Sequence, residues 1–134
     1  MVLTGIIAAK DYSKIEVAFK GPIDLKTEPG KVVTVRFKVD NLTESSQEIT
    51  EKIDLPPNWK LIGTQTDFNL KAKESNLRLI SFLIPKRAPP DSYDLEYSIE
   101  NLNSSFHIEK SIQLTVLPTV DLKVKLTDSP DYVI

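Results

Sequence analysis

The chain has a single histidine, His107, and its imidazole could act as a catalytic base. A hydrolytic triad needs a nucleophile beside a base that an acid orients, and Ser105 and Glu109 share one face of an extended segment with His107. That face is the polar side of an alternating strand, where a histidine is expected to face solvent. We therefore predict no catalytic residue and no enzyme activity.

Carboxylates are the second group of side chains that could take part in catalysis or bind a metal ion. Glycoside hydrolysis needs two carboxylates roughly 5–10 Å apart in a cleft, and the sequence reveals no such pocket. The acidic run Glu44, Glu48 and Glu51 is expected to form loop and solvent-facing charge. Asp121, Asp128 and Asp131 are candidate oxygen ligands for Ca²⁺, with a solvated turn as the alternative. No cofactor is predicted.

Composition excludes several other classes of protein. The chain has no cysteine, which rules out disulfides, thiolate metal sites and a cysteine nucleophile. Its 17 basic and 19 acidic residues lack the positive excess that nucleic-acid binding requires. No stretch approaches the roughly 18–20 apolar residues of a membrane helix, so this segment is not expected to insert in a membrane. Its 134 residues are enough for one domain with a real core.

Period-two alternation is the dominant signal along the chain. Val33, Val35, Phe37 and Val39 alternate with polar residues, which predicts a half-buried strand after the Pro29-Gly30 turn. Residues 77–84 are largely apolar on both faces, which predicts a central strand. Residues 93–100 and 106–116 alternate around a turn-forming loop and predict a hairpin.

No helical periodicity accompanies these strands, and nine prolines interrupt the chain. About seven short strands separated by turns predict an all-β, immunoglobulin-like antiparallel sandwich. Trp59 is expected to fill its core, although a ligand-stacking role is the alternative. Tyr93 is placed to form a tyrosine corner, and Asn41 is placed to cap a turn at a strand end.

The sequence patterns near the two ends of the chain predict the domain boundaries. Residues 1–14 form a lead segment or edge strand, and their apolar start also resembles part of a secretory signal. Residues 15–118 form the sandwich. Residues 119–134 repeat the pattern of residues 15–25 at an offset of about 107, which predicts a linker and the first strand of a following, truncated domain. The alternative is a last strand that folds back on the same sandwich.

Several motifs together resemble the NEW-type Ig-like domains associated with bacterial alpha-galactosidases. They are a Pro-Gly turn, a strand ending in Asn, a Leu-Pro-x-x-Trp corner, a strand ending in Pro and a Tyr-led strand: Pro29-Gly30, Asn41, Leu55–Trp59, Pro85 and Tyr93. The resemblance covers roughly residues 22–117. It departs from the family at Asp91, where glycine is usual, and after Leu42. It implies a spacer or binding module in an exported multidomain protein of bacteria or archaea.

Three functions are compatible with these observations. We expect a non-catalytic module of an exported, bacterial cell-surface or periplasmic protein that acts as a spacer or binds protein, with adjacent domains of the same polypeptide as partners. A carbohydrate-binding accessory domain would need exposed aromatics, and Tyr12, Trp59 and Tyr132 are the candidates. A chaperone- or usher-like assembly factor would exchange an edge strand at residues 15–19, an edge that the charge of Lys20 would guard.

Overall fold

A computed structural model describes residues 14–63, 65, 67–101 and 106–119. These residues form nine strands and no helix, and therefore no helix that could cross a membrane. The strands are β1 (Ile15–Phe19), β2 (Leu25–Thr27), β3 (Val32–Asn41), β4 (Gln47–Asp54), β5 (Lys60–Ile62), β6 (Phe68–Leu70), β7 (Ser75–Leu83), β8 (Asp91–Asn101) and β9 (His107–Val116).

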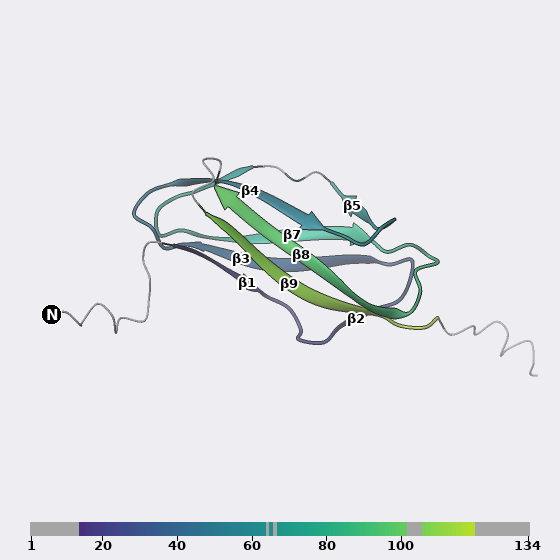
Figure 1. The fold of residues 1–134 in the computed structure, drawn as a ribbon. Coiled ribbons are helices and arrows are strands. Elements are labelled where there is room, and N and C mark those ends of the chain that lie inside the picture. The colour runs from purple at the N-terminus through teal and green to yellow at the C-terminus, as the bar shows by residue number, and fades with distance from the viewer. Residues whose placement is uncertain (1–13, 64, 66, 102–105, 120–134) are drawn as a thin grey trace, which may run out of the picture.

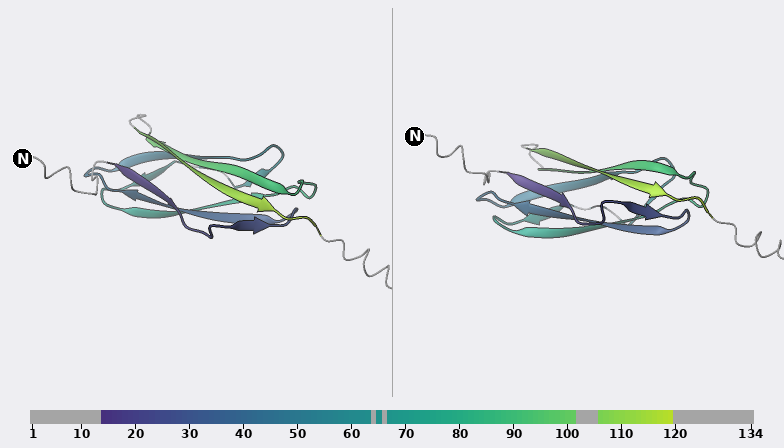
Figure 2. Two further views of the ribbon diagram at one scale, coloured as in Figure 1. Left: turned by 60° about the horizontal axis from the view of Figure 1, so that its bottom comes forward. Right: turned by 90° about the horizontal axis from the view of Figure 1, so that it is seen from below.

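The strands form two sheets packed face to face (Figures 1 and 2). The first sheet has the order β1-β3-β7-β5, and the second has the order β2-β9-β8-β4-β6. Every pairing is antiparallel except that of β2 with β9. The chain therefore leaves the first sheet after β1 and joins the second at β2. The predicted all-β, immunoglobulin-like sandwich is confirmed.

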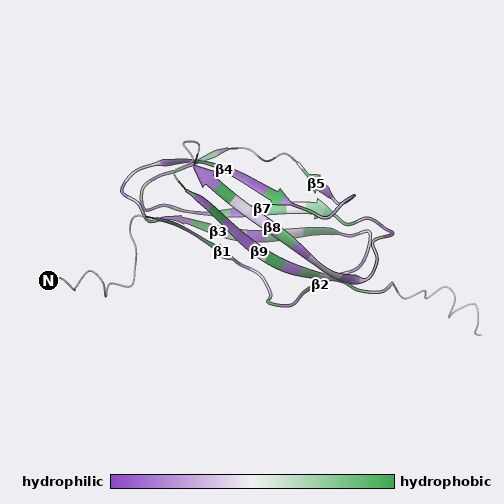
Figure 3. Ribbon diagram, in the orientation of Figure 1, coloured by the Kyte–Doolittle hydropathy of each residue, from purple (hydrophilic) through white to green (hydrophobic). Residues whose placement is uncertain are grey.

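The alternation seen in the sequence decides which side chains enter the core (Figure 3). In β3, Val35, Phe37 and Val39 are buried, whereas Thr34 and Arg36 are exposed. A strand turns successive side chains to opposite faces, so this sequence can bury only one of its two sides. The strand predicted after Pro29-Gly30 is confirmed.

Aromatic rings join the two sheets at the centre of the sandwich. The ring of Phe37 in β3 stacks on that of Tyr97 in β8, with 4.2 Å between centroids. The ring centroid of Trp59 lies 5.8 Å from that of Phe82 and 5.0 Å from that of Tyr93, and only 8% of the Trp59 surface is exposed. Each buried large side chain contributes about 1.5–3 kcal/mol to folding, which makes this cluster a main source of stability.

Two details of the sheets differ from the sequence prediction. Nine strands are present in the described residues rather than about seven, because β2, β5 and β6 are three-residue strands too short to show alternation. The β8–β9 hairpin is confirmed. The predicted central strand is β7, between β3 and β5, but among the described residues no further layer covers its outer face.

The turn before β3 depends on a glycine. Gly30 has φ of +80°, a conformation that other residues rarely adopt, and its N–H donates to the carbonyl of Ile84 at 3.0 Å. That bond holds the start of β3 beside the end of β7. The predicted first strand of a following domain, in residues 119–134, lies outside the described residues apart from Thr119, so it stays a prediction.

Candidate functional site

The outer face of the first sheet presents a row of exposed apolar side chains, which we call the apolar strip. Leu79 is the most exposed of them, at 62%. The strip consists of Val32, Ile62, Leu77, Leu79 and Leu83. These residues lie on the adjacent strands β3, β7 and β5, so they form one surface rather than scattered positions. Soluble monomers rarely expose large contiguous apolar patches, so a group of exposed apolar side chains on one face is a candidate contact surface.

Cations flank the apolar strip, because the strand register places one opposite each leucine. Arg36 pairs with Leu79 and Lys38 pairs with Leu77 across β3 and β7. Lys60 of β5 pairs with Leu83. Lys38 also approaches the carboxylate of Asp40, at 3.7 Å. On this face, the leucines of β7 are interrupted by Ser81, which hydrogen-bonds to Thr34 at 2.7 Å, and cations lie on both sides of the strand.

The outer face of the second sheet has the opposite character. It bears six carboxylates and fewer cations: Glu48, Asp54, Asp94, Glu96, Glu100 and Glu109 face outward, with Lys26, Lys52 and His107 among them. The described strands of this sheet expose no large apolar side chain, although Ile23, in the loop before β2, is fully exposed beside β9. The two outer faces of the sandwich thus differ in both polarity and charge.

His107 lies between two of these carboxylates. Its Nε2 is 2.9 Å from Glu109 and its Nδ1 is 3.2 Å from Glu100. Hydrogen bonding to Glu109, and then to Glu100, raises the pKa of His107 above its ordinary value. Both ring nitrogens face carboxylates, so no nitrogen is directed at a nucleophile among the described residues, and Ser105 lies outside them.

The structure does not test the three aspartates that the sequence suggested as Ca²⁺ ligands. Asp121, Asp128 and Asp131 lie outside the described residues. Within residues 14–63, 65, 67–101 and 106–119, no three His, Cys, Asp or Glu side chains are grouped closely enough to hold a metal ion.

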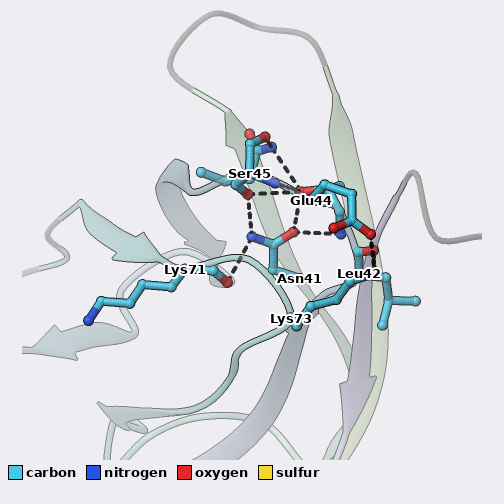
Figure 4. Close-up of polar contacts among 8 residues, drawn as sticks. Asn41, Leu42, Glu44, Ser45, Lys71 and Lys73 are labelled. Atoms are coloured by element: carbon cyan, nitrogen blue, oxygen red, sulfur yellow. Dashed lines mark hydrogen bonds and ion pairs between the residues drawn. The ribbon is translucent and has the colours of Figure 1, made fainter.

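Asn41 organises the corner between β3 and β4 and is fully buried (Figure 4). Its Nδ2 donates to the carbonyls of Ser45, Leu70 and Lys71 at 2.9–3.0 Å. Its Oδ1 accepts from the N–H and the hydroxyl of Thr43, at 2.9 and 2.6 Å. One amide therefore joins the turn after β3 to the end of β6, in the second sheet.

Two of the aromatic residues singled out in the sequence, Phe37 and Trp59, lie inside the sandwich. Phe37 is fully buried, and the buried indole of Trp59 offers no exposed face for a sugar ring. The Tyr93 hydroxyl donates to the carbonyl of Pro89 at 2.6 Å, which is a bond back to the preceding loop. The other two aromatics proposed for sugar stacking, Tyr12 and Tyr132, lie outside the described residues.

Glu51 corrects a prediction. It was expected to face solvent with Glu44 and Glu48, but it is buried between the sheets, where Arg78 and Tyr97 bind it. The signal was present in the sequence, because Glu51 alternates in phase with the core residues Ile49 and Ile53.

A groove lies beside the edge strand β1, on the side of the sandwich where β1 of the first sheet approaches β9 of the second. We call it the edge groove; it has a volume of about 700 Å³. Its walls are the edge strand β1, the turn between β3 and β4, and the start of β9. Its lining combines the apolar residues Ile15, Val17, Ala18, Phe106 and Ile108 with the polar or charged residues Lys14, Glu16, Asp40, Thr43 and Gln47.

Solved structures share this fold. A FixG-related protein from Vibrio parahaemolyticus aligns with 80% of this chain and 98% of its own, at 15% identity and a TM-score of 0.59. An alpha-2-macroglobulin from Salmonella aligns with 78% of this chain, at 18% identity and a TM-score of 0.63. A family 123 glycoside hydrolase from Clostridium perfringens aligns with 79% of this chain, at 12% identity and a TM-score of 0.63.

The extent of these matches differs between proteins. This chain spans 7% of the alpha-2-macroglobulin and 27% of the glycoside hydrolase, so in both it is similar to one part of a larger polypeptide. No family model and no curated protein matches the sequence significantly. Identities below 20% establish a common fold and leave the function to be argued from the residues of this chain.

Proposed function

We propose that this chain is a non-catalytic Ig-like module of an exported multidomain protein, and that it docks a neighbouring domain of the same polypeptide on its apolar strip. The observation on which this rests is the exposure of Leu77, Leu79 and Leu83 along one strand. The larger bacterial proteins that contain a similar sandwich support the modular part of the proposal.

Charge selects the kind of surface that fits the strip. The flanking Arg36, Lys38 and Lys60 favour a partner face with apolar side chains at its centre and carboxylates at its rim. Two copies of this face would bring like charges together, because a two-fold contact pairs a surface with itself. A neighbouring domain of different sequence meets both requirements, and a symmetric dimer through the strip does not.

The absence of a clustered reactive site among the described residues is compatible with such a role. His107 faces two carboxylates. The rings of Trp59 and Tyr97 are buried in the core. The exposed surfaces that remain are suited to contact rather than to reaction. We infer that the module spaces and orients its neighbours, and that export brings it to the cell surface or periplasm.

Photo-crosslinking in the native cell tests the docking proposal. A benzophenone amino acid replaces Leu79 in the intact polypeptide, and a matched variant carries it at Glu96 on the acidic face. We expect crosslinked peptides from another domain of the same polypeptide with Leu79 and few with Glu96. Equal yields at the two positions would contradict docking at the strip, and crosslinks only between identical peptides would replace it with self-association.

Cell fractionation tests the setting of the module. An antibody against this chain should detect a polypeptide much larger than the chain, in the exported fraction and sensitive to protease added to intact or osmotically opened cells. A band of the size of the chain alone would overturn the multidomain proposal. A protease-resistant band in the cytoplasm would overturn export.

A further inference from the structure

The apolar strip is only one strand wide over half of its length. Leu77 and Leu79 form this half, and the residues opposite them on β3 are Lys38 and Arg36. At the Leu83 end the strip widens to include one aliphatic residue from each of β3 and β5. A partner that fits the strip therefore presents a narrow apolar ridge that runs along β7 rather than across the sheet.

A polar pair interrupts the strip within the sheet. Ser81 lies between Leu79 and Leu83 on the same face, and its hydroxyl oxygen is 2.7 Å from that of Thr34 on β3. A buried hydroxyl is costly where it has no hydrogen-bond partner, and this bond persists when water is excluded. Ser81 is therefore compatible with a partner that covers the strip continuously from Leu77 to Leu83.

Arg36 is an unpaired cation beside the narrow half of the strip. It is exposed, and none of the ion pairs among the described residues includes it. Lys38, by contrast, lies 3.7 Å from the carboxylate of Asp40. A guanidinium binds a carboxylate through two parallel hydrogen bonds, so an acidic side chain beside Leu79 would complement Arg36. The charges thus favour a ridge with carboxylates on the flank that faces β3.

An α-helix fits this geometry better than a second sheet does. A helix has an apolar stripe along one side and a diameter of about 10 Å, which equals two strand spacings of about 4.8 Å. A helix centred on β7 packs against the aliphatic stems of Arg36 and Lys38 and leaves their charged ends at its flank. A sheet face would extend across β3 and bury both cations beneath it, which is costly unless each is paired.

We propose that the apolar strip docks an amphipathic α-helix of the neighbouring domain, with an aliphatic stripe along β7 and carboxylates on the flank beside Arg36. This inference rests on the proposed function and adds the kind of element that docks. Leu77 and Leu83 are six residues apart on an extended strand, which is about 20 Å. A helix rises 1.5 Å per residue, so about 13 residues of it cover this distance. The docked helix thus has nearly four turns with aliphatic residues at intervals of three or four.

The described part of a second copy does not supply this partner. It contains no helix. The outer face of its second sheet has the complementary charge, but the strands there expose no large aliphatic side chain to meet the leucines. Because the strip calls for an apolar ridge and an acidic flank together, a different sequence is the better match.

Photo-crosslinking at two positions measures how much partner chain spans the strip. In the intact polypeptide, a benzophenone amino acid replaces Leu77 in one variant and Leu83 in another, with Glu96 on the acidic face as the matched control position. We expect the two leucine positions to capture one segment of the neighbouring domain, at sites about 13 residues apart in its sequence. Both leucine positions should give higher yields than Glu96.

The spacing separates failure of this inference from failure of the proposed function. Sites about six residues apart would identify an extended strand, and sites on separate segments would identify a sheet face or loops. Either result overturns the helix while docking of the neighbouring domain stands. Yields no higher than that at Glu96 overturn both proposals. Sites about 13 residues apart in a different polypeptide support the helix and overturn the assignment to a neighbouring domain.

A charge reversal tests the acidic flank. With the benzophenone at Leu79, Arg36→Glu should lower the crosslinking yield about tenfold, because it replaces an attraction with a repulsion. Lys52→Glu makes the same change of charge on the other outer face and should leave the yield unchanged. Changing the nearest carboxylate of the captured helix to lysine should restore the yield in Arg36→Glu, a rescue that a misfolded variant would not show. An unchanged yield in Arg36→Glu, or an equal fall in Lys52→Glu, overturns the acidic flank.

Discussion

Arg78 of the first sheet and Glu51 of the second form a bidentate ion pair inside the sandwich. Nε lies 3.0 Å from Oε1 and Nη2 lies 2.8 Å from Oε2, and the Glu51 side chain is only 6% exposed. The Tyr97 hydroxyl donates to the same Oε1 at 2.7 Å, and the guanidinium stacks 3.9 Å from the Phe68 ring. Charge, hydrogen bonds and an aromatic face thus converge on one carboxylate.

Removal of Glu51 should therefore be costly. Glu51→Ala leaves the Arg78 charge and the Tyr97 hydroxyl without their partner in a largely dry space, and we expect a loss of about 3–5 kcal/mol in the free energy of unfolding. Urea unfolding followed by Trp59 fluorescence measures it. The double variant Glu51→Leu/Arg78→Met removes both charges and should lose less than Glu51→Ala. A cost below about 1 kcal/mol for Glu51→Ala would show that the pair is effectively solvated.

Tyr97 should make the protein sensitive to alkali. Burial, and then its hydrogen bond to Glu51, raise the pKa of Tyr97 above its ordinary value, so the folded state keeps the phenol protonated. Its contribution to stability is present below the unfolded pKa of about 10 and is lost as the pH rises beyond it, because only the unfolded state ionises there. Between pH 9 and 11, the free energy of unfolding should fall more steeply in the native chain than in Tyr97→Phe. Equal slopes would place the phenol in contact with solvent.

The fold could be predicted from the sequence because a strand that buries one face must alternate. β3 shows this plainly, with Val35, Phe37 and Val39 inward and Arg36 outward. β2, β5 and β6 could not be predicted in the same way, since three residues contain too little alternation to be distinguished from a loop. Their positions depend on pairing with distant strands, which local pattern does not encode.

The surfaces were harder to predict for a different physical reason. A strand with apolar residues on both sides, such as β7, is compatible with a covered face or an exposed one, and only the presence of another layer decides between them. Glu51 was ambiguous for a related reason. An acidic residue in phase with the core residues Ile49 and Ile53 can either interrupt the buried face or be buried in an ion pair. Arg78, the partner that decides, is 27 residues away in the chain.

Asn41 should be intolerant of a substitution that changes only one atom. Asn41→Asp keeps the size of the side chain and its acceptor for Thr43 but replaces the Nδ2 donor, so an oxygen would face the carbonyls of Ser45, Leu70 and Lys71. We expect Asn41→Ala to lose about 3 kcal/mol of stability, and Asn41→Asp to lose at least as much. Thr43→Val, which removes a bond to Oδ1 at the exposed side of the corner, should cost about 1 kcal/mol. An Asp variant as stable as the native chain in thermal unfolding would contradict the donor role.

His107 should titrate above the usual range because Glu109, and secondarily Glu100, hydrogen-bond to its ring and raise its pKa. It is the only histidine, so a two-dimensional NMR titration of its ring protons reports this one group. We expect Glu109→Gln to lower the His107 pKa more than Glu100→Gln does. A raised folded-state pKa also means that the contribution of His107 to stability is full below its unfolded pKa of about 6.5 and is lost as the pH rises through the folded value. Glu48→Gln, on the same face but without a contact to the ring, is the matched control. If Glu48→Gln and Glu109→Gln lower the pKa equally, the general acidity of the face, rather than the two hydrogen bonds, sets it.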